Sequence, residues 1–182
     1  MSSSKRQHHG PTPLYTAAER ARRDATVWTL VQGILAPVQF IVFLASLALV
    51  LRYLATGEGL ALATASIVIK TAVLYLIMVT GAIWEKVVFG RYLFAPAFFW
   101  EDAVSMIVIA LHTAYLWALI TGALSPHDQM LLALAAYATY VINAAQFVWK
   151  LRLARLSAPA VGASGRLDPS ARRSSPGIEA AS

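Results

Sequence analysis

The chain has 182 residues, of which 58% are hydrophobic and only 13% are charged. An average soluble domain carries about 25% charged residues, so this composition, with a mean hydropathy of +0.61, excludes an ordinary soluble globular protein. The length excludes a two-domain arrangement, and the lack of cysteine excludes disulfides, thiolate metal sites and cysteine nucleophiles. The net charge of +6 comes from Lys and Arg in segments beside apolar stretches, so we expect a membrane protein with no nucleic-acid partner.

The chain before the first apolar stretch is predicted to have two parts. Residues 1–13 are expected to form a disordered N-terminal tail. Thr16 and Glu19 then have the spacing of a capping box, in which each side chain bonds the backbone N–H of the other residue at a helix start. A short basic helix through Arg23 is therefore predicted at the membrane interface.

Four apolar stretches are each long enough to cross a bilayer as a helix, which takes roughly 20 residues. They are Ala25–Leu51, Leu60–Trp84, Ala103–Leu124 and Gln129–Trp149. Because backbone groups cannot stay unpaired in hydrocarbon, each stretch is predicted to be helical. The predicted fold is an all-α integral membrane protein with four transmembrane helices in a domain over residues 14–156, followed by a disordered tail over 157–182.

The distribution of Lys and Arg predicts the orientation of these helices. Basic residues are concentrated before the first stretch, between the second and third, and after the fourth, whereas the opposite side has only Arg52. By the positive-inside rule, both termini are predicted to be cytoplasmic. We expect a multi-pass protein of the inner (cytoplasmic or intracytoplasmic) membrane.

The segment between the second and third stretches is unusually aromatic for a loop. Residues 85–102 read EKVVFGRYLFAPAFFWED, so charged side chains flank an aromatic platform. The platform consists of Phe89, Tyr92, Phe94, Phe98, Phe99 and Trp100. We expect this loop to lie along the cytoplasmic interface, where it would suit a flat apolar ligand entering from lipid. An ordinary interfacial aromatic belt is the alternative.

Polar residues inside the predicted spans are candidate functional residues, because placing them in a bilayer is costly. Most lie in the predicted cytoplasmic half: Gln32, Gln39, Glu85, Lys86, Glu101, Asp102, Asn143 and Gln146. Lys70 and His112 lie near the midplane. Lys70 is expected to be a structural charge paired across the bundle rather than a catalyst. For His112 three roles stay open: ligand of a tetrapyrrole metal, proton relay, and hydrogen-bonded packing residue.

Several long motifs resemble one family. They are PLYTAAERARRDATVWTLVQGILAPVQF, LRYLATGEG, GAIWEKVVFGRYLFAPAFFWED, ALHTAYL and AAYATYVINAAQF, within Pro13 to Leu156. In these motifs the chain resembles the 3-vinyl (bacterio)chlorophyllide hydratases of anoxygenic phototrophic bacteria. The resemblance implies a hydro-lyase that adds water to the 3-vinyl group of a chlorophyllide-type pigment, giving a 3-(1-hydroxyethyl) group in bacteriochlorophyll biosynthesis.

Markovnikov hydration of a vinyl group needs an acid that protonates the terminal carbon and a base that orients water. Carboxyl groups at an apolar boundary keep their protons more readily than in water, so Glu101, Asp102 and Glu85 are the candidate acids. The Glu101–Asp102 pair is preferred over Glu85, and Glu101 is favoured within it because it shares a helix face with Ser105 and His112. His112 or the ionised partner carboxylate would orient the water.

The predicted substrate-binding residues are Phe98, Phe99, Trp100, Tyr115, Asn143 and Gln146. The two amides are candidates to hold a propionate or the ring ketone. We expect no cofactor and no protein metal site, since the magnesium belongs to the substrate. The expected partners are a chlorophyllide-type tetrapyrrole, membrane lipid and neighbouring enzymes of the pathway.

Two non-enzymatic alternatives stay open. A pigment-binding assembly protein would share the aromatic platform and His112 but would not need the carboxylates. A small four-helix transporter would normally show a polar path through both leaflets, whereas the predicted periplasmic half is nearly bare of polar groups apart from Arg52 and Glu58.

Overall fold

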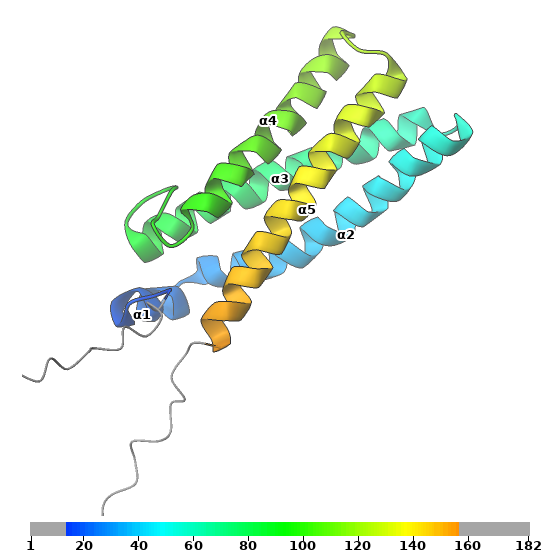
Figure 1. The fold of residues 1–182 in the computed structure, drawn as a ribbon. Coiled ribbons are helices and arrows are strands. Elements are labelled where there is room, and N and C mark those ends of the chain that lie inside the picture. The colour runs from blue at the N-terminus through cyan, green and yellow to red at the C-terminus, as the bar shows by residue number, and fades with distance from the viewer. Residues whose placement is uncertain (1–13, 157–182) are drawn as a thin grey trace, which may run out of the picture.

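The computed structural model describes residues 14–156 and contains five helices (Figure 1). They are α1 (Ala17–Ala25), α2 (Val27–Thr56), α3 (Leu60–Phe89), α4 (Phe99–Thr121) and α5 (Pro126–Leu156). Helices α2 to α5 are long and apolar enough to cross a membrane, and no strand occurs in the described range. The prediction of an all-α protein with four such helices is confirmed. The predicted tails, 1–13 and 157–182, lie outside the described residues.

The four long helices form two hairpins. Helix α2 packs against α3, and α4 packs against α5, with fewer contacts between the hairpins. The short loops 57–59 and 122–125 lie at one end of the bundle (Figure 1). Helix α1, the loop over residues 90–98 and the end of α5 lie at the other, which we call the α1 end.

Two buried clusters hold the bundle together. The larger one extends from the middle of the bundle to the end opposite α1 and includes Phe43, Val50, Ile67, Tyr115 and Tyr137. The smaller one lies at the α1 end, where Tyr15, Val88 and Phe98 pack with partly buried neighbours such as Trp84 and Phe147. Aromatic rings therefore pack in both clusters, and those of the smaller cluster hold the α1 end together.

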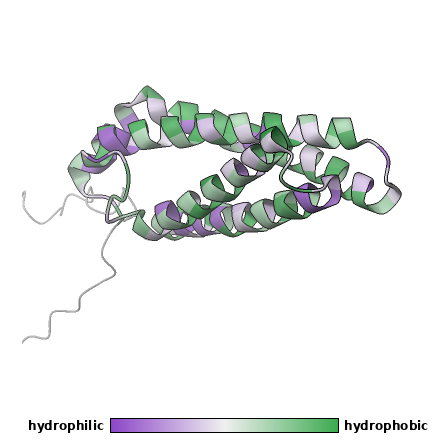
Figure 2. Ribbon diagram, turned by 90° about the horizontal axis from the view of Figure 1, so that it is seen from above, coloured by the Kyte–Doolittle hydropathy of each residue, from purple (hydrophilic) through white to green (hydrophobic). Residues whose placement is uncertain are grey.

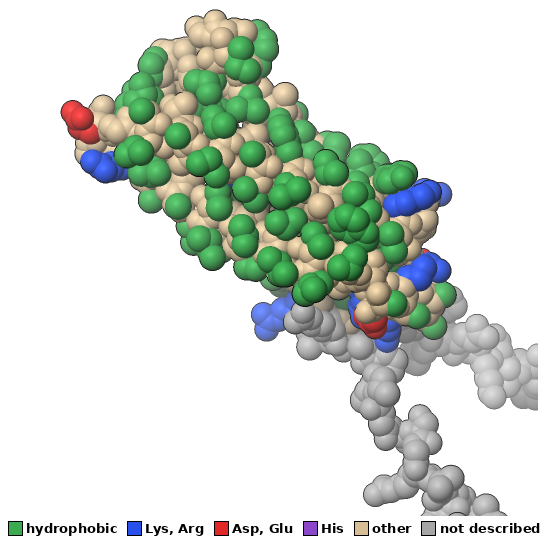
Figure 3. Space-filling view, turned by 180° about the vertical axis from the view of Figure 1, so that it is seen from behind, with side chains coloured by type: hydrophobic (Ala, Val, Ile, Leu, Met, Phe, Trp, Pro, Cys, Tyr) green, Lys and Arg blue, Asp and Glu red, His purple; other side chains and the backbone are tan. Residues whose placement is uncertain are grey.

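The outer surface of the bundle is apolar. Large side chains such as Trp117 and Ile120 are mostly exposed, at 62% and 82%. Hydrophobic residues predominate along the long helices (Figure 2) and cover the sides of the bundle, while Lys and Arg gather at its ends (Figure 3). Such a surface is expected for helices that face lipid.

Helix α1 begins as the sequence predicts. The Thr16 backbone N–H donates to Glu19 Oε2 at 2.8 Å, and the Glu19 N–H donates to Thr16 Oγ1 at 3.2 Å, which forms the capping box. The hydrogen bonds from Thr16 also lower the pKa of the Glu19 carboxyl. At the other end of α1, Arg22 Nε donates to the Val88 carbonyl of α3 at 2.8 Å. This bond ties α1 to the bundle.

Candidate functional site

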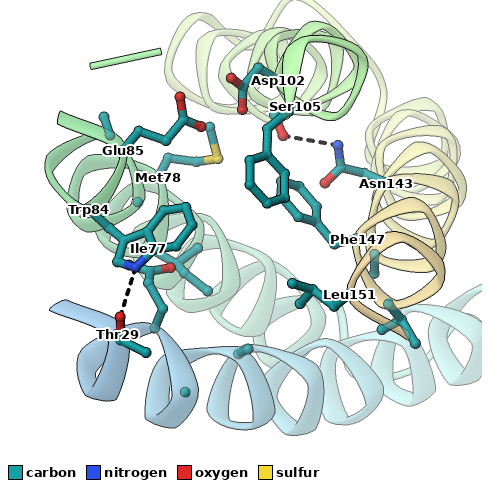
Figure 4. A pocket seen from close by; sticks show the side chains of 18 of the residues that line it. Thr29, Ile77, Met78, Trp84, Glu85, Asp102, Ser105, Asn143, Phe147 and Leu151 are labelled. Atoms are coloured by element: carbon teal, nitrogen blue, oxygen red, sulfur yellow. Dashed lines mark hydrogen bonds between the residues drawn. The ribbon is translucent and has the colours of Figure 1, made fainter. Parts of the chain in front are cut away.

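A cavity of about 1030 Å³ lies at the α1 end, where residues of α1 and of all four long helices line it. Figure 4 shows the part of the cavity between the long helices. Pockets for small molecules typically measure about 300–1,000 Å³, so this one has room for a large ligand. Its walls are mainly apolar and include Phe40, Met78, Trp84, Phe98 and Phe147. The sequence concentrates polar span residues at this same end, and several of them line the cavity.

Two buried carboxyl groups face each other on one wall of the cavity. Glu85 on α3 and Asp102 on α4 are 4% and 3% exposed, and their side chains lie within hydrogen-bonding reach of each other (Figure 4). A hydrogen bond between two carboxyl groups requires a proton on one of them. The pair can therefore hold one proton beside an ionised partner.

The same two carboxyl groups hold the aromatic loop in place. The Phe94 backbone N–H donates to Asp102 Oδ2 at 2.7 Å, and the Ala95 N–H donates to Glu85 Oε2 at 3.3 Å. Phe94 has a φ of +58°, a conformation that non-glycine residues rarely adopt. The bond to Asp102 thus fixes a strained turn of the loop as well as one edge of the cavity.

Glu101 points elsewhere. Its Oε2 accepts a hydrogen bond from Lys150 Nζ on α5 at 2.6 Å, and it borders a shallow groove outside the bundle, together with Gln146. The expectation that Glu101, rather than Asp102, faces the interior is wrong. Consecutive helical residues project about 100° apart, and Lys150 draws Glu101 towards α5 while Asp102 meets Glu85.

The predicted substrate-binding residues fall into two groups. Phe98 and Asn143 line the cavity, whereas Phe99, Trp100, Gln146 and Tyr115 do not. Phe99 and Trp100 are 46% and 71% exposed on the outer surface, and Tyr115 is fully buried in the larger cluster. The aromatic platform is thus divided between the cavity wall and the outer surface of the bundle.

Asn143 is positioned by α4. Its Nδ2 donates to the Glu101 carbonyl at 2.8 Å and to Ser105 Oγ at 2.9 Å (Figure 4). Both amide hydrogens are used, so Asn143 can offer a ligand its side-chain oxygen but no further N–H.

His112 and Lys70 form a buried pair behind the cavity. His112 Nδ1 lies 2.8 Å from the Val108 carbonyl, which can only accept, so the ring carries its hydrogen on Nδ1. Its Nε2, 2.9 Å from Lys70 Nζ, then accepts from the lysine. The lone pair that a metal would need is occupied, and this geometry fits the packing alternative for His112. Lys70 has a partner across the bundle, as expected, and that partner is the His112 imidazole.

Tyr140 separates this pair from the cavity. Lys70 Nζ lies 4.1 Å from the centre of the Tyr140 ring, a cation–π contact, and Tyr140 itself lines the cavity. Within residues 14–156, no group of three or more His, Asp or Glu side chains could hold a metal ion.

Among the cavity residues that lay outside the predicted site, Gln39 and Arg20 are two polar side chains with chemistry to offer a ligand. Gln39 is 1% exposed, and neither its amide oxygen nor its nitrogen has a hydrogen-bond partner in the described part of the chain. Gln39 was visible as a polar residue in an apolar span, but nothing in the sequence distinguished it from Gln32, whose Nε2 bonds Thr80 Oγ1 at 2.8 Å. Arg20 of α1 also lines the cavity, although its sequence context indicates only an interfacial basic helix.

Comparison with known proteins agrees with the resemblance in the motifs. The family model described as 2-vinyl bacteriochlorophyllide hydratase matches residues 15–153. A 2-vinyl bacteriochlorophyllide hydratase of Cereibacter sphaeroides is 78% identical over 79% of this chain and 89% of its own length. One of Rhodobacter capsulatus is 73% identical over 80% of this chain and 84% of its own length. No solved structure matches the chain significantly. The chain belongs to the 2-vinyl bacteriochlorophyllide hydratase family.

Proposed function

We propose that this chain adds water to the vinyl group of a bacteriochlorophyllide-type pigment, giving a 1-hydroxyethyl group in bacteriochlorophyll biosynthesis. The names of its relatives support this reaction. The observation in the structure that carries the proposal is the buried Glu85–Asp102 pair at the wall of a cavity large enough for a macrocycle.

The reaction begins with a proton transfer to carbon. The protonated member of the pair donates its proton to the terminal vinyl carbon, where the π electrons form the new C–H bond. A cation then develops on the carbon attached to the macrocycle. Water then forms the C–O bond at that carbon and releases a proton to the ionised carboxylate. The pair ends with the same number of protons, now on the former base, and the cycle closes when that proton passes to the former acid, its neighbour in the pair.

The hydrogen bonds indicate which carboxyl group is the acid and which is the base. A carboxylate is stabilised by a backbone N–H donor, and the bond to Asp102 is shorter than the bond to Glu85, 2.7 against 3.3 Å. Asp102 is therefore the base that receives the proton from water, and Glu85 is the acid. This assignment departs from the sequence-based preference for Glu101.

The remaining cavity residues orient the pigment and exclude bulk water. The rings of Phe98 and Phe147 stack with their centres 5.8 Å apart and form part of the apolar wall. Gln39 and the side-chain oxygen of Asn143 bind polar substituents of the pigment. No separate cofactor is needed, because side chains make both proton transfers and the magnesium arrives with the substrate.

The protein is a multi-pass membrane protein, and we place it in the inner membrane with the α1 end in the cytoplasm. Membrane lipid surrounds its apolar sides, and neighbouring enzymes of the pathway are its further partners. The pigment, which is itself apolar, partitions into the same membrane.

The test is turnover by purified protein. Protein in detergent or nanodiscs is incubated with the vinyl pigment in H₂¹⁸O, and the absorption spectrum and mass of the pigment are followed. Hydration removes vinyl conjugation, shifts the absorption and places ¹⁸O in the product. Tight pigment binding without ¹⁸O incorporation would instead support the pigment-binding alternative.

A further inference from the structure

We call the part of the cavity that α1 lines its mouth, and this part carries the basic side chains of the lining. Among the lining residues, Arg20 and Arg23 are basic, and both belong to α1. Asp24 lies beside them, while the other two acidic lining residues, Glu85 and Asp102, form the catalytic pair. The charge at the mouth therefore depends on how these two arginines are paired.

Arg23 is already paired. Its Nη2 and Nε lie 2.6 and 2.8 Å from Asp24 Oδ1, and its guanidinium lies over the Tyr15 ring, 4.8 Å from the ring centre. Arg20 is different: its side chain is half-buried, lines the cavity, and has no side-chain hydrogen bond or ion pair within residues 14–156. A half-buried guanidinium with five unused N–H donors is well suited to a carboxylate.

The Tyr15 hydroxyl is a second unused donor at the mouth. Tyr15 is 4% exposed and lines the cavity. Its hydroxyl lies near Arg23, yet no group in the described range meets hydrogen-bonding geometry with it. Burial raises the pKa of this hydroxyl, so it stays a neutral O–H donor at physiological pH. Buried polar groups are normally hydrogen-bonded, so this hydroxyl is a donor without a partner on a residue that lines the cavity.

We propose that Arg20, assisted by the Tyr15 hydroxyl, binds the carboxylate of a free-acid pigment at the mouth of the cavity and thereby selects the acid over its ester. This inference rests on the proposed function for the identity of the pigment. The carboxylate end stays at the polar mouth, while the macrocycle lies against Phe98 and reaches the Glu85–Asp102 pair. An esterified pigment has no charge for Arg20 and places an alkyl group at the mouth.

The test compares one pigment in two forms, the vinyl bacteriochlorophyllide free acid and its methyl ester. Dissociation constants come from quenching of pigment or tryptophan fluorescence, and KM and kcat from the hydration assay. Wild-type protein is expected to prefer the acid. Arg20→Gln is expected to weaken binding of the acid and raise its KM by about 10- to 100-fold, with kcat little changed and no effect on the ester. Tyr15→Phe is expected to weaken binding of the acid and to raise its KM as well, by a smaller factor.

Arg91→Gln is the matched control, because Arg91 is an exposed arginine at the same end of the bundle that does not line the cavity. It should behave as wild type with both pigments. Two results would overturn the inference: wild-type protein binds acid and ester equally, or Arg20→Gln weakens binding of both equally. Either result would indicate that Arg20 instead holds α1 against the bundle or binds lipid headgroups. If wild type binds the pigments but hydrates neither, the proposed function fails, and the acid–ester difference in binding still decides the role of Arg20.

Discussion

Two adjacent carboxyl groups at the start of α4 have different surroundings. Glu101 is ion-paired with Lys150 outside the cavity, whereas Asp102 faces Glu85 inside it. The ion pair gives Glu101 a structural contact with α5. A carboxyl–carboxyl contact lets Asp102 exchange a proton with its partner.

The first prediction compares variants of the pair. Asp102→Asn and Glu85→Gln are each expected to lower the hydration rate by about 10²–10⁴-fold. In both variants the amide oxygen can still accept the hydrogen bond from the aromatic loop, so the loop is retained while proton transfer is lost. Initial rates at matched amounts of folded membrane protein measure the effect.

Glu101→Gln is the control for these variants, since it changes the neighbouring carboxyl group in the same way. It should keep the rate within a few-fold and cost about 1 kcal/mol of stability or less, because Lys150 is partly exposed. An inactive Glu101→Gln beside a normally active Asp102→Asn would restore the sequence-based assignment and refute the one from the cavity.

The second prediction concerns Gln39, whose buried amide has no partner. An unsatisfied buried polar group costs about 1–3 kcal/mol, so Gln39→Leu is expected to stabilise the pigment-free protein against thermal unfolding. The same change should weaken pigment binding, because the ligand loses its polar contact. Gln32→Leu is the control, since it removes a formed bond to Thr80 and should destabilise the protein. If Gln39→Leu leaves pigment affinity unchanged, Gln39 does not contact the ligand.

The third prediction tests the roles left open for His112. His112→Phe is expected to lower stability because Lys70 loses its buried hydrogen-bond partner. The double variant His112→Phe/Lys70→Met should recover most of that stability and keep near-normal hydration. Thermal unfolding and turnover are measured on both variants and on wild type. A stable double variant that cannot hydrate pigment would show that the pair takes part in the reaction.

At the scale of the elements, apolar runs predict where the helices are but not where they end. The second apolar stretch ends at Trp84, whereas α3 continues to Phe89 and is capped by Gly90 with a φ of +81°. Hydropathy marks the part of a helix that faces lipid, while the helix end depends on a glycine that can adopt the left-handed conformation. The capping box of α1, in contrast, is a local motif and could be predicted.

The fourth prediction concerns this helix end. Gly90→Ala is expected to lower stability by roughly 1 kcal/mol, because a Cβ is unfavourable at this φ even though space is available. Gly33→Ala is the control, since Gly33 lies within α2 and a Cβ there meets nothing within 4 Å. It should be neutral or slightly stabilising, because alanine favours helix. Thermal unfolding in detergent measures the stability of both variants. Equal effects of the two substitutions would show that a side chain does not strain the backbone at Gly90.

At the scale of the molecule, the site depends on contacts that a linear pattern does not encode. Lys150 and Glu101 are 49 positions apart, and Trp84 bonds Thr29 across 55 positions. Each of these pairs joins the two helices of one hairpin, so it follows from how those two helices are rotated and shifted against each other. The sequence could therefore predict which end of the bundle carries the polar residues, but not that Asp102 rather than Glu101 would face Glu85.

The last prediction concerns the orientation of the whole bundle. Helix α1, the 90–98 loop and the end of α5 lie together at one end (Figure 1). The basic residues there include Arg20, Arg22, Arg23, Lys86, Arg91, Lys150 and Arg152, whereas Arg52 belongs to the opposite end. Since Lys and Arg are retained on the cytoplasmic side, the α1 end is expected to be cytoplasmic.

Reporter fusions measure this orientation. Fusions at Glu58 and Ser125 should report the periplasm, and a fusion after Arg155 should report the cytoplasm. A carboxylate-bearing pigment would then meet Arg20 from the cytoplasmic side, and the Glu85–Asp102 pair would lie in the cytoplasmic half of the bilayer. A periplasmic signal from the fusion after Arg155 would contradict this orientation and move the mouth of the cavity to the other side of the membrane.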